Sequence, residues 1–280
     1  MISTVAIVGV GLIGASFALA LKKCGFSGRI LGVSSEGALR AGLESGAIDE
    51  GCSLESAAPR ADLIYLSQTI HRIIEVFPAL NGLVRPGALV TDAGSTKQTI
   101  VSAAGRALTK CQFLGGHPLA GKEQRGAVAA DPDLFRNRRY VLTPTGPNDL
   151  ETPGAAEFLE WIKRIGAIPV VITSQEHDRT VALTSHLPQL ASTALAAVVA
   201  QHIGSDESLR VSGTGLLDMT RLAMSPFDVW HEILATNASS LERALQIYIA
   251  KLEQIRQALD QPALRGDFEA ASALAQKLRS

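Results

Sequence analysis

Two polar side chains, Ser95 and His117, stand where apolar runs of the sequence end. Ser95 belongs to TDAGSTKQ at 91–98, and His117 belongs to FLGGHPLAGKEQRG at 113–126. Neutral imidazole can accept a proton near pH 7, so His117 is a candidate general base, and a serine within hydrogen-bonding reach would orient it. Taken alone, His117 could equally be structural, and Ser95 could form a capping box with Gln98.

A glycine pattern near the amino terminus predicts a phosphate-binding turn. VAIVGVGLIG at 5–14 has G-x-G-x-x-G spacing, between an apolar run of strand length and a segment of helical length. Gly9 allows a tight turn, Gly11 lets the backbone approach a pyrophosphate, and Gly14 lets the helix pack closely on the strand. The helix amino terminus favours phosphate charge, so we expect NAD or NADP here rather than an empty glycine-rich turn. The residues assigned to this site are Gly9, Gly11, Leu12, Ile13 and Gly14.

The choice between NAD and NADP depends on the end of the second strand, in RILGVSSEG at 29–37. Ser34 stands where NAD-binding proteins often have an acidic residue for the ribose 2′-hydroxyl. A neutral serine accepts a 2′-phosphate without repulsion, and Arg40 follows a turn later, whereas Glu36 could replace the missing acid. Ser34 is therefore assigned to the cofactor site with either cofactor, although Ser34 and Ser35 could simply cap the next helix.

The elements that position these residues follow from an alternation of short β-rich runs with amphipathic segments of helical length. Parallel strands need crossover connections, usually helices, so residues 1–173 are expected to form a Rossmann-type, doubly wound α/β sheet. Ser95 and His117 would then lie at the carboxyl edge of the sheet, with His117 just after its strand. The expected strands are Val5 to Gly9, Arg29 to Val33, Asp62 to Ser67, Ala88 to Asp92, Gln112 to Gly115, Tyr140 to Thr143 and Ile168 to Ile172.

The strand signal stops after residue 173, and the rest is rich in Ala, Leu, Gln and Glu with helical spacing. Residues 174–280 are expected to form an all-α domain, beginning with a capping box of Thr173 and Glu176 and a helix that continues past Pro188. Residues 187–199 are apolar on nearly all sides, which predicts contact with a second subunit and hence a homodimer. Further helices are expected from Pro226, over 238–259 and over 267–278.

Composition narrows the partners and the compartment. The chain has 26 basic and 27 acidic residues without one-sign blocks, so neither nucleic acid nor a membrane surface is an expected partner. The 3 cysteines lack C-x-x-C spacing, which favours the cytoplasm and argues against disulfides or a cysteine zinc site. The histidines lack ligand spacing, so no metal is expected. The apolar stretch 187–200 is too short to span a bilayer.

Five stretches make the sequence resemble the TyrA family of prephenate and arogenate dehydrogenases. They occur in family order over nearly the whole chain: GVGLIGASFALALK, TDAGSTKQ, GGHPLAG, EHDRTVALTSHLPQ and SGTGLLDMTRLAMSPFDVW. The resemblance implies that His117 is the catalytic base, Ser95 its partner beside the nicotinamide, Arg221 the cation that binds a substrate carboxylate, and His186 a residue of the substrate pocket. Because the expected fold accounts for the entire chain, no fused regulatory ligand-binding or chorismate mutase domain is expected.

The residues themselves leave other interpretations open. Arg221 taken alone would be a solvated helix residue, and His186 a buried core histidine. Lys122 stands where the family has threonine, and Glu123 matches an acidic gate residue of some members. Trp230, Asp218 and His177 are interpreted as packing and capping residues.

The resemblance implies an oxidative decarboxylation of a small-molecule substrate, with hydride transfer to NAD or NADP. Prephenate would give 4-hydroxyphenylpyruvate, and arogenate would give tyrosine. Two alternatives remain. A β-hydroxyacid dehydrogenase would carry a catalytic lysine on the first long helix of the second domain, where this chain has His186. An NAD(P)-sensing dimer would need no base such as His117.

Overall fold

Strands and helices alternate up to residue 171, and the strands form one sheet. The structure, a computed structural model, describes residues 1–279 except the side chain of Asp206. The strand order is β3-β2-β1-β4-β5-β6-β7-β8. The strands are β1 (Thr4–Val8), β2 (Arg29–Val33), β3 (Glu50–Gly51), β4 (Leu63–Leu66), β5 (Leu89–Asp92), β6 (Gln112–Pro118), β7 (Arg139–Thr143) and β8 (Ile168–Val171).

All neighbouring strands are parallel except β6 and β7, which are antiparallel. The predicted doubly wound, mostly parallel sheet is therefore confirmed. Strand β3 was not predicted, because two residues are too short to show a periodic pattern. The strand order reverses between β1 and β4, and the carboxyl ends of strands at such a switch point form the usual dinucleotide crevice.

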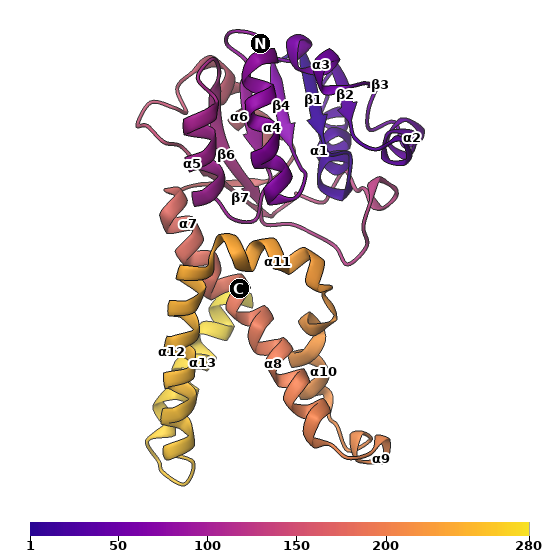
Figure 1. Cartoon of the computed structure of the whole chain (residues 1–280). Coiled ribbons are helices and arrows are strands. Elements are labelled where there is room, and N and C mark those ends of the chain that lie inside the picture. Colours follow the sequence, from indigo (N-terminus) through magenta and orange to yellow (C-terminus); the bar gives the residue numbers. More distant parts are fainter. Residues whose placement is uncertain (280) are drawn as a thin grey trace.

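Helices cover both faces of the sheet (Figure 1), so the central strands are mostly apolar. On one face, Phe17 of α1 stacks on Tyr65 of β4 with ring centroids 4.1 Å apart. On the other face, Phe77 of α4 meets Phe113 of β6 at 5.5 Å. The helices of this part are α1 (Leu12–Lys23), α2 (Glu36–Glu44), α3 (Leu54–Ala57), α4 (Ile70–Leu83), α5 (Gln98–Ala107) and α6 (Pro153–Arg164), with 3-10 turns at Ala58–Arg60 and Ala127–Ala129.

The rest of the described chain is helical, as predicted. Thr173 caps α7, because its hydroxyl accepts from the Glu176 N–H at 3.1 Å. A π-helical turn at Ala182–His186 joins α7 to α8, and Pro188 lies in the first turn of α8, where a missing N–H costs little. The helices are α7 (Ser174–Val181), α8 (Leu187–His202), α9 (Asp206–Leu209), α10 (Thr214–Thr220), α11 (Phe227–Thr236), α12 (Ala238–Gln257) and α13 (Leu264–Arg279), with a 3-10 turn at Arg221–Met224.

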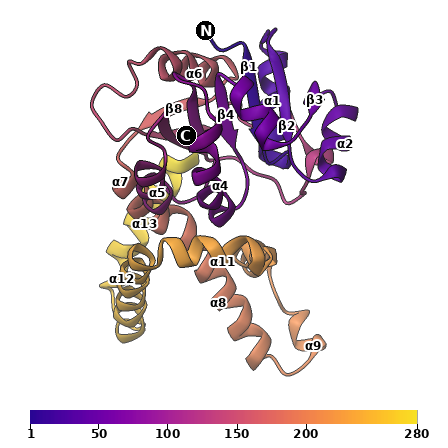
Figure 2. The ribbon, with the colours of Figure 1, turned by 45° about the horizontal axis from the view of Figure 1, so that its top comes forward.

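The helical part meets the carboxyl edge of the sheet and then extends away from it. In Figures 1 and 2, α11 lies across the underside of the sheet, while α8 and α12 point outward as two separate arms. Apolar side chains are exposed along these arms and along α13, including Val198 of α8 at 55%, Ile249 of α12 at 60% and Phe268 of α13 at 74%. None of the helices within residues 1–279 is both long and apolar enough to cross a membrane.

Candidate active site

The glycine turn after β1 is held between the ends of two neighbouring strands. Gly9 has a φ of +101°, which side-chain-bearing residues rarely adopt. Its N–H donates to the Val33 carbonyl at 2.8 Å, at the end of β2. The Ser67 hydroxyl, just after β4, donates to the Gly9 carbonyl at 2.8 Å. The turn therefore has a fixed shape at the switch point.

This turn fits the phosphates of a dinucleotide. A Cβ on Gly11 would meet nothing within 4 Å, so the backbone there faces open space. Gly11 is also the N-cap of α1 and offers no side-chain cap, so the first N–H groups of the helix, those of Leu12 and Ile13, remain available to an anion. Close by, the buried amide oxygen of Gln68 has no hydrogen-bond partner among the described residues. Together these features form a cradle with donors for phosphate and one unused acceptor.

The end of β2 leaves both cofactors open. Ser34 follows the strand directly and is half-buried. Ser35 occupies the N-cap of α2, yet its side chain makes no cap hydrogen bond, so the predicted capping role is not seen. Glu36 pairs with Arg40 at 3.3 Å on the exposed surface. The acid and the cation that would favour NAD and NADP respectively therefore neutralise each other.

His117 lies within β6 rather than after it, which corrects the expected loop position. Strand β7 runs antiparallel to β6 and pairs as far as Pro118, so that His117 stands opposite Val141. This pairing extends the strand by three residues beyond Gly115, its predicted end. The imidazole still projects at the carboxyl edge of the sheet, the same edge as the Gly9 turn, because β1, β4, β5 and β6 are parallel.

A hydrogen-bonded chain of two histidines and an aspartate ends at His117. Its Nδ1 lies 2.8 Å from Nε2 of His177, and Nδ1 of His177 lies 2.7 Å from Oδ1 of Asp178. The His177 side chain is fully buried, and that of Asp178 is 1% exposed. The interpretation of His177 as a packing residue was therefore incomplete, because its ring contacts the candidate base directly.

Asp178 also holds the amino terminus of α5. Its two carboxylate oxygens accept from the backbone N–H groups of Lys97 and Gln98 at 2.7 and 2.9 Å. The cap of α5 therefore comes from helix α7, more than 80 residues away in the chain. A capping box between Ser95 and Gln98 is wrong, since the N-cap of α5 is Lys97. Nor does Ser95 have a hydrogen bond to His117 among the described residues.

A buried ion pair lies next to this series of hydrogen-bonded side chains and joins two strands. Lys97 and Asp92 are both fully buried, and the Lys97 ammonium bonds to Oδ2 of Asp92. The other carboxylate oxygen of Asp92 accepts from the Gly116 N–H at 3.1 Å, next to His117. Burial lowers the pKa of Lys97, and the Asp92 carboxylate opposes that shift. This pair ties the end of β5 to the end of β6.

Electrostatics favour the neutral form of His117. Although part of the residue is exposed, burial lowers its pKa well below the ordinary value of 6.5, and His177, Lys97 and His186 act in the same direction. A neutral imidazole is the form that accepts a proton. His117 is therefore ready to act as a base at neutral pH.

His186 lies inside the protein. The residue is 2% exposed, its Nδ1 is 3.3 Å from Nδ2 of Asn237, and its ring meets Trp230 at 5.8 Å between centroids. Burial lowers its pKa to about 4. Asn237 also donates to the Asp178 carbonyl at 2.7 Å, which links His186 to the same polar group. Whether His186 contacts a substrate stays a prediction.

Arg221 reaches the loop that follows His117. It begins the 3-10 turn after α10 and lines a cavity of about 780 Å³ together with Lys122, Glu123 and Arg125. Lys122 pairs with Asp131 at 2.6 Å. Residues about 100 positions apart in the chain therefore face one cavity, and it carries three cationic side chains and one acidic one.

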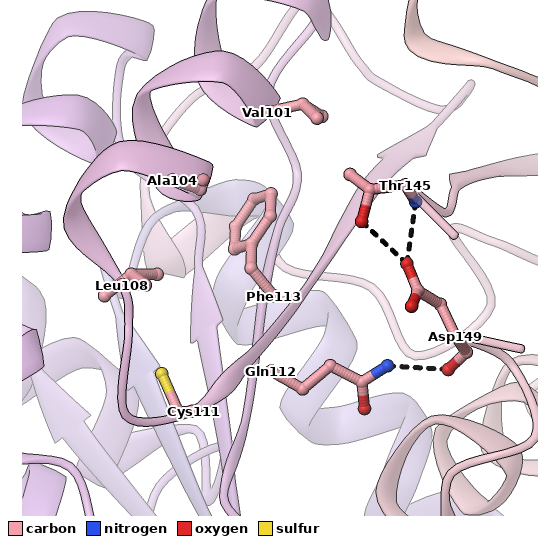
Figure 3. A pocket seen from close by; sticks show the side chains of 9 residues that line it. Val101, Ala104, Leu108, Cys111, Gln112, Phe113, Thr145 and Asp149 are labelled. Atoms are coloured by element: carbon pink, nitrogen blue, oxygen red, sulfur yellow. Dashed lines mark hydrogen bonds between the residues drawn. The ribbon is translucent and has the colours of Figure 1, made fainter.

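A second, smaller cavity lies at the opposite edge of the sheet (Figure 3). It measures about 240 Å³ and is lined by α5, the start of β6 and the loop after β7. Its polar groups already bond to one another: Gln112 donates to the Asp149 carbonyl at 2.6 Å, and Asp149 accepts from Thr145. This cavity is remote from His117 and contributes nothing to the candidate site.

Comparison with known proteins decides the family. The model of the prephenate dehydrogenase nucleotide-binding domain matches residues 17–167, and that of the prephenate dehydrogenase dimerization domain matches residues 173–275. The chain belongs to the prephenate dehydrogenase family. The prephenate dehydrogenase of Lactococcus lactis subsp. cremoris is 32% identical over 263 residues, covering 92% of this chain and 70% of that protein.

Two solved structures extend the family likeness to the whole fold. The prephenate dehydrogenase from Aquifex aeolicus, in complex with hydroxyphenyl propionate and NAD+, has a TM-score of 0.85 and 27% identity, covering 100% of this chain and 96% of that one. Synechocystis arogenate dehydrogenase has a TM-score of 0.84 and 29% identity, with coverages of 98% and 99%. The predicted family and the NAD(P) class of cofactor are thereby confirmed.

Within this prephenate dehydrogenase family fold, sequence reasoning predicted His117 as the base but missed the residues that hold it. In the sequence, His177 and Asp178 are two polar residues near the start of a predicted helix, and Lys97 is a basic residue near the start of another. Neither pattern indicates a contact with His117. Only the EHD sequence after the Thr173 cap offered a signal, and nothing in its spacing pointed to His117.

Proposed function

We propose that this chain oxidatively decarboxylates prephenate, arogenate or both, with His117 as the base and NAD(P) as the hydride acceptor. The observation that carries the proposal is the placement of His117. Its imidazole lies at the carboxyl edge that also carries the Gly9 turn, and its Nδ1 is already occupied by His177. Nε2 is therefore the nitrogen left to face a substrate.

The chemistry needs one base and tight positioning. Nε2 of His117 takes the proton from the ring hydroxyl while the hydrogen on the same carbon leaves as hydride. The bound nicotinamide supplies the acceptor for that hydride. The bond between the ring and its carboxylate then breaks and carbon dioxide leaves. The electron pair of that bond stays with the ring and makes it aromatic. The phenolate oxygen recovers the proton from His117, so no net proton is released.

Substrate recognition is assigned to the cavity that Arg221 lines. Both candidate substrates carry a carboxylate on the ring, and guanidinium binds a carboxylate with two parallel hydrogen bonds. Arg125 and Lys122 add positive charge to the same cavity. Ser95, three residues after β5, is proposed to lie beside the nicotinamide, and His186 to border the substrate from the helical side.

We propose that residues 1–173 bind the cofactor and that residues 174–280 complete the substrate site and form a homodimer. The match of residues 173–275 to a dimerization domain supports the dimer. So do the exposed apolar side chains of the outward arms and of α13, because exposed apolar surface marks protein interfaces. Light scattering during size-exclusion chromatography tests this. Phe268→Asp in α13 should yield monomer, whereas the matched control Leu43→Asp in α2 should remain a dimer.

The cytoplasm is proposed as the working compartment, because Cys24, Cys52 and Cys111 are all free thiols. Thiol titration of the purified enzyme under native and denaturing conditions would support this with three reactive groups per chain.

The activity is tested by following reduced nicotinamide absorbance with prephenate and arogenate, each paired with NAD and NADP. Turnover in any pairing, reduced about 100-fold or more in His117→Asn, supports the proposal. The four pairings also show which substrate and which cofactor are used. No turnover in any pairing, with cofactor binding intact, would refute it and favour an NAD(P)-sensing role.

A further inference from the structure

The two bonds beyond His117 have a defined direction. A base that takes a proton at Nε2 must be neutral with its single proton on Nδ1, so Nδ1–H of His117 donates to Nε2 of His177. That nitrogen must then be unprotonated, which leaves the proton of His177 on Nδ1, where it donates to Oδ1 of Asp178. Each ring therefore has one tautomer that satisfies both of its neighbours.

Asp178, at the far end of this series of hydrogen bonds, is held by several partners. Asp178 accepts from three N–H groups, those of His177, Lys97 and Gln98, and its own backbone carbonyl accepts from Asn237. Its carboxylate also faces the amino terminus of α5, which stabilises negative charge. The aspartate therefore cannot rotate away, and the His177 ring, fully buried, is held in one orientation.

The charges around His117 make such an anchor useful. Lys97 and His186 disfavour a positive charge on His117, and Asp92 is already engaged with Lys97. The carboxylate of Asp178 lies one imidazole farther away and can polarise His177 toward His117. A strong acceptor at Nδ1 lowers the cost of the imidazolium that forms when Nε2 takes a proton.

We propose that His177, held by Asp178, is the positioning residue that fixes the tautomer of His117 and stabilises its protonated form during catalysis. This inference rests on the proposed function, in which His117 is the base. The arrangement has the logic of a serine protease triad, in which a third group orients the base without taking its proton. Here a second histidine stands between the base and the carboxylate.

Two substitutions of His177 separate an acceptor role from a packing role. His177→Gln keeps a carbonyl oxygen that can accept from Nδ1–H of His117, and its amide can donate to Asp178. His177→Leu fills similar space but offers no acceptor. His202→Leu, at the exposed end of α8, serves as the matched control. Thermal unfolding of each variant shows whether it is folded.

We expect His177→Leu to lower kcat about 100-fold or more, with KM and the Kd of the cofactor changed less than about threefold. His177→Gln should recover kcat to within about 10-fold of wild type. Nitrogen NMR of ¹⁵N-histidine-labelled, full-length enzyme gives a second readout. Nδ1 of His117 should have the shift of a protonated nitrogen in wild type and in His177→Gln, and an averaged shift in His177→Leu.

Several results would overturn the inference. A folded His177→Leu enzyme with wild-type kcat, or a His177→Gln enzyme as impaired as His177→Leu, shows that the acceptor does not matter. An unchanged His117 spectrum in all variants does the same. If wild type turns over neither substrate, the proposed function fails, and the NMR comparison still decides whether His177 sets the His117 tautomer. If His177→Leu does not fold, the glutamine variant and its spectrum decide.

Discussion

Gly14 and Gly11 belong to the same turn, and the structure assigns them different penalties for a single added methyl group. A Cβ on Gly14 would lie 2.3 Å from the Gly9 carbonyl oxygen and 2.7 Å from Cγ2 of Ile7, whereas ordinary contacts begin at 3.4 Å. Helix α1 or the atoms that it meets would therefore have to shift. A Cβ on Gly11 would meet no atom within 4 Å. Its φ of −100° also suits alanine.

The two alanine variants should therefore fail in different ways. Overpacking of this kind costs about 1–3 kcal/mol, so Gly14→Ala should lower Tm by roughly 2–12 °C for a domain of this size. Gly11→Ala should keep the wild-type Tm within about 1 °C, because nothing in the fold is displaced. Its methyl group would instead occupy the space assigned to the pyrophosphate, raising the Kd of the cofactor about 10-fold or more.

The assay combines thermal unfolding without cofactor and calorimetric titration with NAD and NADP. The contrast is decisive because each variant is the control for the other. A Gly14→Ala protein as stable as wild type would show that α1 is not packed against β1 as described. A Gly11→Ala protein that binds both cofactors normally would place the pyrophosphate elsewhere.

Three further outcomes are expected. Lys97→Met leaves the buried Asp92 carboxylate without its cation and should lower the free energy of unfolding by about 3–5 kcal/mol in urea titrations. The double variant Lys97→Met with Asp92→Asn should recover most of this loss. An equal loss in both variants would contradict the ion-pair argument. Arg221→Gln should raise KM about 10- to 100-fold in steady-state assays with little change in Tm, and an unchanged KM would remove Arg221 from the substrate site. The pKa of His186 is about 4 in the folded protein, against an ordinary value of 6.5. As the pH falls, the unfolded chain therefore binds the proton before the folded protein does. Stability that is present above pH 6.5 is lost as the pH falls toward 4. From about pH 7.5 to about pH 5, His186 alone should lower the free energy of unfolding by about 2 kcal/mol, and His117 should lower it further. Denaturant midpoints of wild type and His186→Gln measure the difference, and equal pH dependence in the two would refute it.

Much of the fold was predictable because its signals are local. The glycine spacing at 9–14 specifies a turn geometry, and alternating strand-length and helix-length runs specify a doubly wound sheet, since each run reflects burial of its own residues. Thr173 capped its helix as expected, because a cap and its target are only three residues apart. Where a prediction failed, a distant segment had intervened: β7 lengthened β6, and Asp178 took the capping role expected of Ser95.

The sequence by itself determined most of the elements and the nucleotide turn, and it predicted a histidine base at the sheet edge. These depend on chain neighbours, whose positions backbone geometry already constrains. Only the tertiary structure decided which side chain holds that base. His117 and His177 are 60 positions apart and lie on a strand and a helix, and no periodicity within either segment records their contact. Packing of α7 against the carboxyl edge places Nε2 of His177 2.8 Å from Nδ1 of His117. The same packing brings in the Asp178 carboxylate, which bonds to His177.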